Sequence, residues 1–311
     1  MTCYEIMDPR FKALIDPVAF LETLHEGNRW AEGPVYFADL RCLIWSDIPN
    51  ERMLRWDEET GHVSQFRAPV PNANGNTRDR EGRLITCEQG GRWVMRTECD
   101  GSLTVLADRY GTARLNSPND VVVKSDGSIW FTDPNYGITS DYVGRKDEQE
   151  IEGCHVYRID QGSGALDIVA DDFAMPNGLA FSPDESKLYI ADSGFLTDET
   201  APHHVRVFDV VDNALKNGRV FADINPGIPD GLRIDVEGNA WISAWDGVQC
   251  HTQEGELIGK IRVPEIVANL TFGGKRNNRL FVTATTRLYA VFLNVAGVNF
   301  PFQRSHPTAR R

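Results

Sequence analysis

The chain has 311 residues, of which 41% are hydrophobic and 25% are charged, a composition typical of soluble globular proteins. Its formal net charge of −13 opposes binding to nucleic acid and to anionic membrane surfaces. No apolar stretch approaches the roughly 20 residues that span a bilayer, and the N-terminal region carries charges where a secretory signal is apolar. The six cysteines form no CxxC pair, which indicates reduced thiols and predicts a cytoplasmic protein.

The N-terminal extension over 1–29 contains the only sustained helical periodicity, at 8–24, which predicts one or two short helices packed outside the first repeat. From about residue 30 onward, short β-branched and aromatic runs alternate with turns rich in Gly, Pro, Asn and Asp. Examples are SIWFTD (128–133), KLYIAD (187–192), NAWISAW (239–245) and RLFVTA (279–284). The polar stretch 137–153 predicts an insertion between two strands, and 299–311 a basic tail.

Similar units begin near residues 30, 74, 117, 175, 228 and 268. Each contains four strand-like runs, and four strands in a repeat of about 40–50 residues are typical of β-propeller blades. A parallel α/β fold is disfavoured because no helical segments separate the strands, and a β-sandwich does not explain the long period. We therefore predict an all-β fold: a single six-bladed β-propeller domain over 1–311, with a short N-terminal helical segment.

Oxygen-bearing side chains recur where these units open. SPND (117–120), MPNG (175–178) and IPDG (228–231) share this feature, and AEGP (31–34) adds a fourth opening. Equivalent positions of different blades meet around the channel, so Glu32, Asn119, Asn177 and Asp230 are predicted to converge at one mouth. Two carboxylates and two amide oxygens suit a hard divalent cation such as Ca²⁺, Mg²⁺ or Mn²⁺ better than Zn²⁺.

Simpler interpretations exist for these residues. Asn and Asp before Gly are common turn residues, so Asn177 and Asp230 can be explained by turns alone. Asp120 either supports a metal ligand or caps a turn. Arg114 either binds a ligand near the mouth or is a surface arginine. The chain has no HExxH, GxSxG or P-loop motif, which disfavours the corresponding zinc-protease, serine-hydrolase and nucleotide-binding chemistries.

Five segments occur in the order found in a known family: EGPVYF, LNSPNDVVVKSDGSIWFTDPNYG, MPNGLAFSPDESKLYIADS, GIPDGLRIDVEGNAWIS and LTFGG. From about residue 28 to 290 the chain resembles the senescence-marker-protein/gluconolactonase family. The resemblance implies a six-bladed propeller with one divalent metal in the channel, bound by Glu32, Asn119, Asn177 and Asp230. Ca²⁺ is the expected ion, with Mg²⁺, Mn²⁺, Zn²⁺ and Fe(II) as alternatives.

The implied activity is hydrolysis of an aldonolactone to its aldonic acid, with Asp230 as general base. Asn119, Arg114 and Gln89 are expected to contact the substrate, a small sugar lactone. Gln89, in CEQGG (87–91), stands where the gluconolactonase-like branch often has His, so the preferred lactone remains open. The alternatives are hydrolysis of other esters or organophosphates at the same site, and a non-enzymatic binding propeller. The sequence does not determine the oligomeric state.

Overall fold

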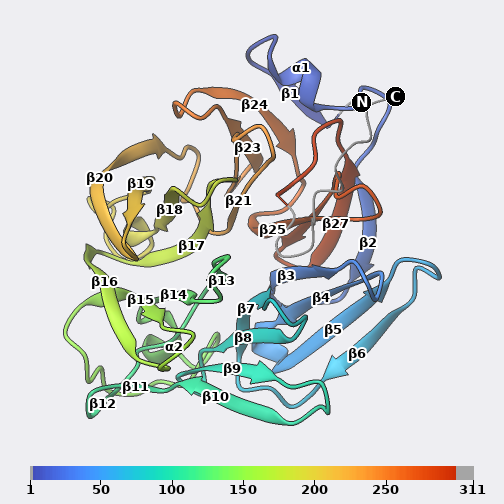
Figure 1. Cartoon of the computed structure of the whole chain (residues 1–311). Coiled ribbons are helices and arrows are strands. Elements are labelled where there is room, and N and C mark those ends of the chain that lie inside the picture. The colour runs from blue at the N-terminus through green and yellow to red at the C-terminus, as the bar shows by residue number, and fades with distance from the viewer. Residues whose placement is uncertain (1–2, 299–311) are drawn as a thin grey trace, which may run out of the picture.

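The computed structural model describes residues 3–298, and their strands form six antiparallel blades around a central channel (Figure 1). The innermost strands are β3 (Ala31–Phe37), β7 (Ala73–Arg78), β13 (Val121–Val123), β17 (Pro176–Phe181), β21 (Leu232–Ile234) and β25 (Val267–Gly273). The second strands are β4 (Cys42–Asp47), β8 (Leu84–Glu88), β14 (Ile129–Asp133), β18 (Lys187–Asp192), β22 (Ala240–Ala244) and β26 (Arg279–Ala284). The predicted all-β propeller and its blade starts are confirmed.

The outer half of each blade follows the same plan. The third strands are β5 (Arg52–Asp57), β9 (Trp93–Thr97), β15 (Cys154–Ile159), β19 (His204–Val211), β23 (Gly247–His251) and β27 (Arg287–Phe292). The fourth strands are β6 (Val63–Arg67), β10 (Leu103–Ala107), β16 (Leu166–Phe173), β20 (Ala214–Asp223), β24 (Leu257–Arg262) and β2 (Glu22–Glu26). Each inner strand contacts the inner strands of the two neighbouring blades, so the ring is closed.

The short N-terminal helix predicted within 8–24 is present, but it covers only part of that range. Only α1 (Phe11–Leu14) is helical there, and β2 instead pairs with β27 to complete the sixth blade. The preceding strand β1 (Tyr4–Ile6) pairs with β24 as a fifth strand of the fifth blade. Strand pairing prevails over local periodicity because the outer edge of β27 would otherwise leave its backbone groups unpaired. The N-terminal segment thus joins the last blade and closes the ring.

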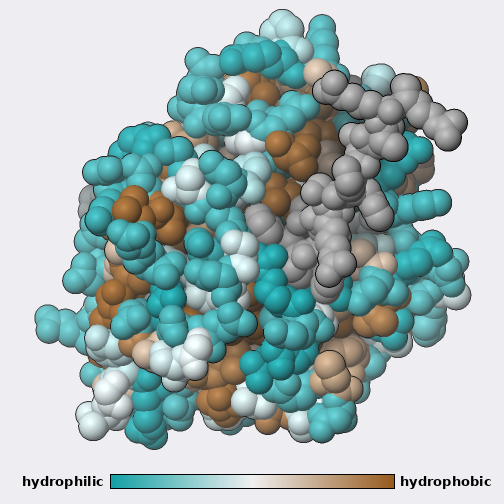
Figure 2. Space-filling model, viewed as in Figure 1, coloured by the Kyte–Doolittle hydropathy of each residue, from teal (hydrophilic) through white to brown (hydrophobic). Residues whose placement is uncertain are grey.

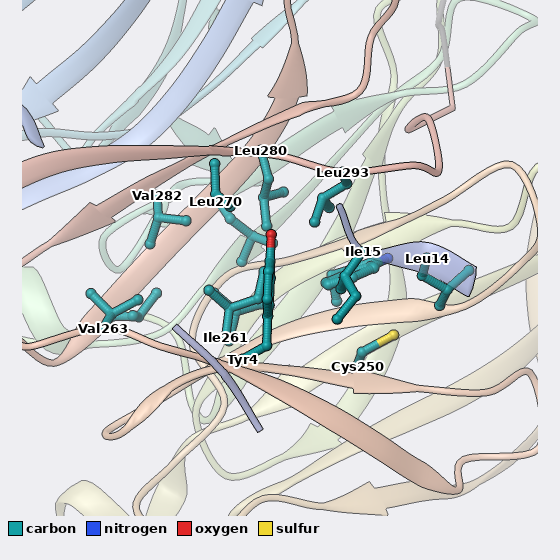
Figure 3. Close-up of a cluster of buried hydrophobic side chains, with 14 of the residues drawn as sticks. Tyr4, Leu14, Ile15, Cys250, Ile261, Val263, Leu270, Leu280, Val282 and Leu293 are labelled. Carbon is teal, nitrogen blue, oxygen red and sulfur yellow. The ribbon is translucent and has the colours of Figure 1, made fainter. Parts of the chain in front are cut away.

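The short helix α1 packs on the fifth and sixth blades and not outside the first. Phe11 is fully buried, and its ring centroid lies 6.0 Å from that of Trp241. Around it, Tyr4, Leu14 and Ile15 join side chains from β23, β24, β25 and β26 in one apolar cluster (Figure 3). This cluster fastens the N-terminal segment to the ring, because apolar area removed from water stabilises the folded chain by about 25 cal/mol per Å².

The interior between blades is apolar, with three fully buried tryptophans, Trp45, Trp130 and Trp241, each on the second strand of its blade. The face seen in Figure 2 is largely hydrophilic with scattered apolar residues. Within residues 3–298, no helix has the length and apolar character needed to cross a membrane.

The remaining short elements lie in loops between the blade strands. They are η1 (Ile48–Asn50), β11 (Arg109–Tyr110), β12 (Ala113–Arg114), α2 (Tyr136–Thr139) and η2 (Gly194–Leu196). The polar stretch 137–153 is an insertion between β14 and β15, as predicted. Because β14 runs antiparallel to β13, this insertion leaves the blade at the mouth where β13 begins. The predicted tail at 299–311 lies outside the described residues.

Candidate functional site

The four predicted ligand residues all lie at the mouth of the channel where the inner strands begin. Glu32, Asn119 and Asn177 are 2%, 5% and 3% exposed. Asp230 lies two residues before β21. Glu32 and Asn177 are each the second residue of an inner strand, and Asn119 lies two residues before β13. The structure therefore brings together four residues that are up to 198 positions apart in sequence.

Two further polar residues of the inner strands were missed by the sequence analysis. Asn74 opens the inner strand of the second blade, and Asn269 lies one position further along in the sixth, where Ala268 takes the place of the ligand candidates. Both asparagines are buried. Their sequences, ANGN (73–76) and VANL (267–270), lack the Pro-containing pattern of the other openings. The sequence signal that could have found them is an Asn near the expected start of each repeat. With these two, every blade contributes an Asn, Asp or Glu to this mouth.

The glycines that follow the ligand residues serve close packing between blades. A Cβ on Gly178 would lie 2.2 Å from the carbonyl oxygen of Asp230, and one on Gly231 would lie 2.0 Å from Oδ1 of Asn269. The amide of Gly178 also donates to the Asp230 carbonyl at 3.0 Å. Neither glycine has a positive φ. The turn interpretation of Asn177 and Asp230 is therefore wrong. The residues after them are glycines because neighbouring inner strands leave no room for a side chain there.

A buried network joins the first, third and sixth blades. Asn269 Nδ2 donates to Glu32 Oε2 at 3.1 Å and lies 3.5 Å from Asp120 Oδ2. Asp120 is fully buried, and its Oδ1 accepts the amide of Val121 at 2.9 Å. The guanidinium of Arg233 is 3.9 Å from Asp120 Oδ2. Asp120 thus links Asn269 to Arg233. This position fits a residue that supports a neighbouring metal ligand better than a residue that caps a turn.

The carboxyl groups at this mouth resist ionisation, chiefly because of burial. Burial, followed by the charges of Asp230 and Asp120, raises the pKa of Glu32 well above its ordinary value. Burial and the charge of Asp120 raise the pKa of Asp230 to about 8, and a hydrogen bond from Asn177 partly offsets this. Burial also raises the pKa of Asp120, against the favourable charge of Arg233. Buried like charges held this close call for a cation.

The donor set fits a hard divalent ion only when the amides are included. Among the described residues, no three His, Cys, Asp or Glu side chains form a metal site by themselves. Two carboxylates supplemented by the amide oxygens of Asn119 and Asn177 make an all-oxygen set, which is the kind that Ca²⁺, Mg²⁺ and Mn²⁺ prefer. The mutual repulsion of the buried carboxyl groups supports the same conclusion, because a bound cation would relieve it.

Three aspartates at the ends of second strands hold the loops that carry these residues. Asp47 Oδ1 accepts the amide of Arg29 at 2.8 Å, three residues before Glu32. Asp133 accepts the amides of Asn116 and Ser117 at 2.8 and 2.7 Å. Asp192 accepts those of Ala174 and Met175 at 3.1 and 2.9 Å. Each aspartate is buried and fixes the approach to an inner strand, the kind of support that precise ligand placement requires.

These three aspartates were also missed by the sequence analysis. Their signal is the recurring Asp that closes the second strand in WSD (45–47), FTD (131–133) and IAD (190–192). The opening that carries Asp230 is held differently, because the amide of Asp230 donates to the hydroxyl of Ser243 at 2.8 Å. The same repeat therefore encodes both the candidate ligand residue and the contact that holds its loop.

The insertion 137–153 reaches from the third blade to the first. The Tyr142 hydroxyl donates to the carbonyl of Arg29 at 3.3 Å, and Arg145 pairs with Glu51 at 3.1 Å. Its centre is Asp147, whose Oδ2 accepts hydrogen bonds from Arg92 at 2.9 Å and Arg114 at 3.0 Å. The insertion is thus fixed across part of the mouth that carries the carboxyl cluster.

The other two predicted substrate residues take different places. Arg114 lies on the exposed hairpin β11–β12, and its guanidinium pairs with Asp147 of the insertion. Gln89 is 1% exposed, and its Oε1 has no hydrogen-bond partner. A Cβ on Gly137 would lie 2.7 Å from Cβ of Gln89, so Gln89 adjoins the start of the insertion. Gln89 therefore lies at the mouth that carries the carboxyl cluster, whereas Arg114 forms an ion pair with the insertion.

A cavity of about 280 Å³ opens at the opposite mouth. Its walls are the later halves of the inner strands, including Tyr36, Phe181 and Phe272, and it is also lined by Arg233. It is separate from the carboxyl cluster, which lies where the same strands begin. Arg233 extends from this cavity toward Asp120 and so lies between the two ends of the channel.

Comparison with known proteins gives consistent matches over most of the chain. The sequence pattern of the SMP-30/Gluconolactonase/LRE-like region matches residues 30–286. A gluconolactonase from Zymomonas mobilis is 31% identical over 91% of this chain and 84% of its own length. A pentonolactonase from Haloferax volcanii is 30% identical over 82% of this chain and 81% of its own. The solved structure of a gluconolactonase from Xanthomonas campestris has a TM-score of 0.87 at 37% identity, covering 93% of this chain and 94% of that one.

Proposed function

Because the chain belongs to the SMP-30/gluconolactonase/LRE-like family, we propose that it is a metal-dependent sugar lactonase that hydrolyses an aldonolactone to its aldonic acid. The matched relatives are lactonases for sugar-derived lactones, so the chain is a carboxylic-ester hydrolase of that kind. The observation that carries the metal dependence is the carboxyl cluster, in which burial, followed by neighbouring carboxylates, raises the pKa values of Glu32 and Asp230.

The chain's own residues divide the work of ester hydrolysis. Glu32, Asn119, Asn177 and Asp230 would hold the divalent ion, with Ca²⁺ as the first choice. When bound, the ion would supply a Lewis acid for the lactone carbonyl and lower the pKa of a water molecule. Asp230 is the general base: it takes the proton of the attacking water, and the bound ion would keep its carboxylate ionised at neutral pH.

The remaining residues place and enclose the substrate. The amides of Asn119 and Asn177 present hydrogen-bonding groups beside the reacting ester. Asp133 and Asp192 hold the backbone before those two residues and so fix their direction. Gln89, which is buried beside the start of the insertion, is the proposed acceptor for a sugar hydroxyl because its Oε1 has no hydrogen-bond partner. Opening of the ester yields a carboxylic acid and a free hydroxyl, so one proton is released per turnover at neutral pH.

A substrate panel tests this proposal. We expect rapid acid release from glucono- or xylonolactone in weakly buffered pH indicator, after subtraction of spontaneous hydrolysis, and no release from phosphotriesters. Activity should return to a chelated sample when a divalent ion is added back. If the protein hydrolyses phosphotriesters but not lactones, the organophosphate alternative would be favoured. Metal-loaded protein that is inactive on every lactone and ester would favour a binding propeller.

The anchoring of the insertion predicts a milder phenotype. Replacing Asp147 with alanine removes the acceptor shared by Arg92 and Arg114, so we expect KM for the lactone to rise about 3–10-fold with kcat nearly unchanged. Hydrogen exchange in 137–153 should become faster. The matched control is Asp209→Ala, which breaks a half-buried ion pair to Lys187 at 2.9 Å near the other end of its blade. Equal effects of the two variants would contradict the assigned role of the insertion.

A further inference from the structure

The cavity at the mouth opposite the carboxyl cluster is lined by cations and by no acidic side chain. Arg78, Arg233 and Lys275 line it, together with neutral residues from all six inner strands, three of them aromatic. Its volume of about 280 Å³ is close to the lower end of the range for small-molecule sites, about 300–1,000 Å³. This gathering of positive charge stands out in a chain with a net charge of −13. The cavity is therefore suited to a small anion.

Arg233 is the central cation of this cavity. It is the middle residue of β21, and its neighbours Leu232 and Ile234 are both buried. The Arg233 side chain lines the cavity and is 18% exposed. Among the described residues its only hydrogen bond runs from Nη1 to the carbonyl of Leu232, at 2.7 Å. A guanidinium carries five N–H donors, so Arg233 can donate further hydrogen bonds to an oxyanion in the cavity.

Two carboxylates that adjoin the lining residues are already engaged. Asp39 Oδ2 accepts from Arg78 at 2.5 Å, but Asp39 is 57% exposed, so solvent screens much of this pair. Glu58 Oε2 accepts from the hydroxyl of Tyr36 at 2.7 Å. Lys275 is exposed in the loop after β25 and forms no ion pair with any residue of 3–298. The positive charge of the cavity is therefore only partly compensated by the protein.

Arg233 also connects this cavity to the carboxyl cluster. Its guanidinium lies 3.9 Å from Asp120 Oδ2, too far for a hydrogen bond, so the two groups interact through charge alone. Asp120 Oδ2 lies 3.5 Å from Asn269 Nδ2, which donates to Glu32 at 3.1 Å. An anion in the cavity attracts the guanidinium and reduces its compensation of Asp120. The cluster then attracts a cation more strongly, so anion and cation favour each other's binding.

We infer that this cavity binds a small organic anion through Arg233 and Lys275, and that the bound anion raises the affinity of the carboxyl cluster for its divalent ion. The ligand carries a carboxylate or phosphate group, since both present oxygen acceptors that match a guanidinium. The aromatic and aliphatic walls contact its carbon skeleton. The anion site goes beyond the proposed lactonase function, and the coupling rests on the cation site of that proposal.

Calorimetry on the full-length protein, with and without Mn²⁺, tests the anion site. The probes are gluconate and glucose 6-phosphate, with glucose as the neutral control. We expect at least one anion to bind with a Kd of about 1 mM or tighter and glucose not to bind, and the tighter anion identifies the preferred acid group. Arg233→Gln should raise this Kd about tenfold or more, and Lys275→Gln about threefold.

The matched control is Arg276→Gln, which removes a charge from the same loop at a residue outside the cavity wall. It should leave the Kd of the anion within about twofold. If Arg233→Gln fails to fold, the comparison of Lys275→Gln with Arg276→Gln still decides the matter. The absence of saturable anion binding by the native protein would overturn the inference. So would binding that Lys275→Gln and Arg276→Gln weaken equally, since it would then follow loop charge and not the cavity.

The coupling has its own measurement. A saturating anion should lower the Kd for Mn²⁺ about 5–10-fold, and saturating Mn²⁺ should lower the Kd of the anion by the same factor. Arg233→Gln should abolish both effects. Coupling that persists in this variant would place the anion on the ion itself and overturn the assignment to Arg233. Lactone hydrolysis is measured separately, so a protein that hydrolyses lactones without binding these anions keeps the proposed function and loses only this inference.

Discussion

Replacing Asp230 with asparagine is expected to lower kcat/KM for lactone hydrolysis by about 10³-fold or more. The change keeps the shape of the side chain but removes the proton acceptor, and general bases typically contribute about 10²–10⁴-fold. It also withdraws a negative charge from the cation site. Steady-state kinetics at saturating divalent ion separate these effects, because the loss of the base persists when the site is filled. Calorimetry of the same samples measures how far ion affinity has dropped.

Asp235→Asn is the matched control for this variant. Asp235 is buried in the same blade, at the other end of β21, where its Oδ2 accepts the indole NH of Trp241 at 2.9 Å. Its replacement should reduce stability, because that hydrogen bond and those from Asn239 are weakened, yet leave kcat/KM within a few-fold. An Asp230→Asn protein that keeps a tenth of native kcat/KM at saturating ion would refute the base assignment.

The sequence allowed the fold and the four central residues to be predicted for one physical reason. Each blade repeats the same strand and loop plan, so the openings EGP, PND, PNG and PDG align by period alone. The glycines were harder to interpret, because Asn-Gly and Asp-Gly are also turn pairs. Only the interblade geometry shows that Gly178 and Gly231 are set by contact between neighbouring inner strands.

The parts that could not be predicted depend on contacts between distant segments. Residues 22–26 have a sequence compatible with helix, and their pairing with β27 is decided by an unpaired edge more than 260 positions away. Nothing in the local sequence distinguishes Asn269 from other strand residues. Its importance follows from the contacts of its side-chain amide with Glu32 and Asp120. Likewise, the first turn of the insertion is held by hydrogen bonds of the Gly137 backbone with Ser117 and Arg145, which no local sequence pattern announces.

Removal of the divalent ion is expected to abolish lactone hydrolysis and to lower stability in a pH-dependent way. An ion present at about 100 times its Kd stabilises the native state by about 2.7 kcal/mol, so chelation should lower the Tm by about 5 °C or more at pH 8. In the ion-free protein the pKa of Asp230 is raised to about 8 from an ordinary value of 3.8. The pKa of Glu32 is also raised above its ordinary value. A pKa raised by folding stabilises the folded state at low pH, and that contribution is lost as pH rises toward the folded-state value.

The gap in Tm between ion-loaded and chelated protein should therefore widen from pH 5 to pH 8. Binding below pH 8 displaces the proton of Asp230, so calorimetry in buffers of different ionisation enthalpy should detect release of about one proton or more at pH 7. Glu32→Gln and Asp230→Asn each remove one titrating carboxyl and should narrow the pH dependence, whereas Asp235→Asn should not. A Tm gap that is constant or shrinks over this range, or binding without proton release, would mean that these carboxyl groups do not hold the ion.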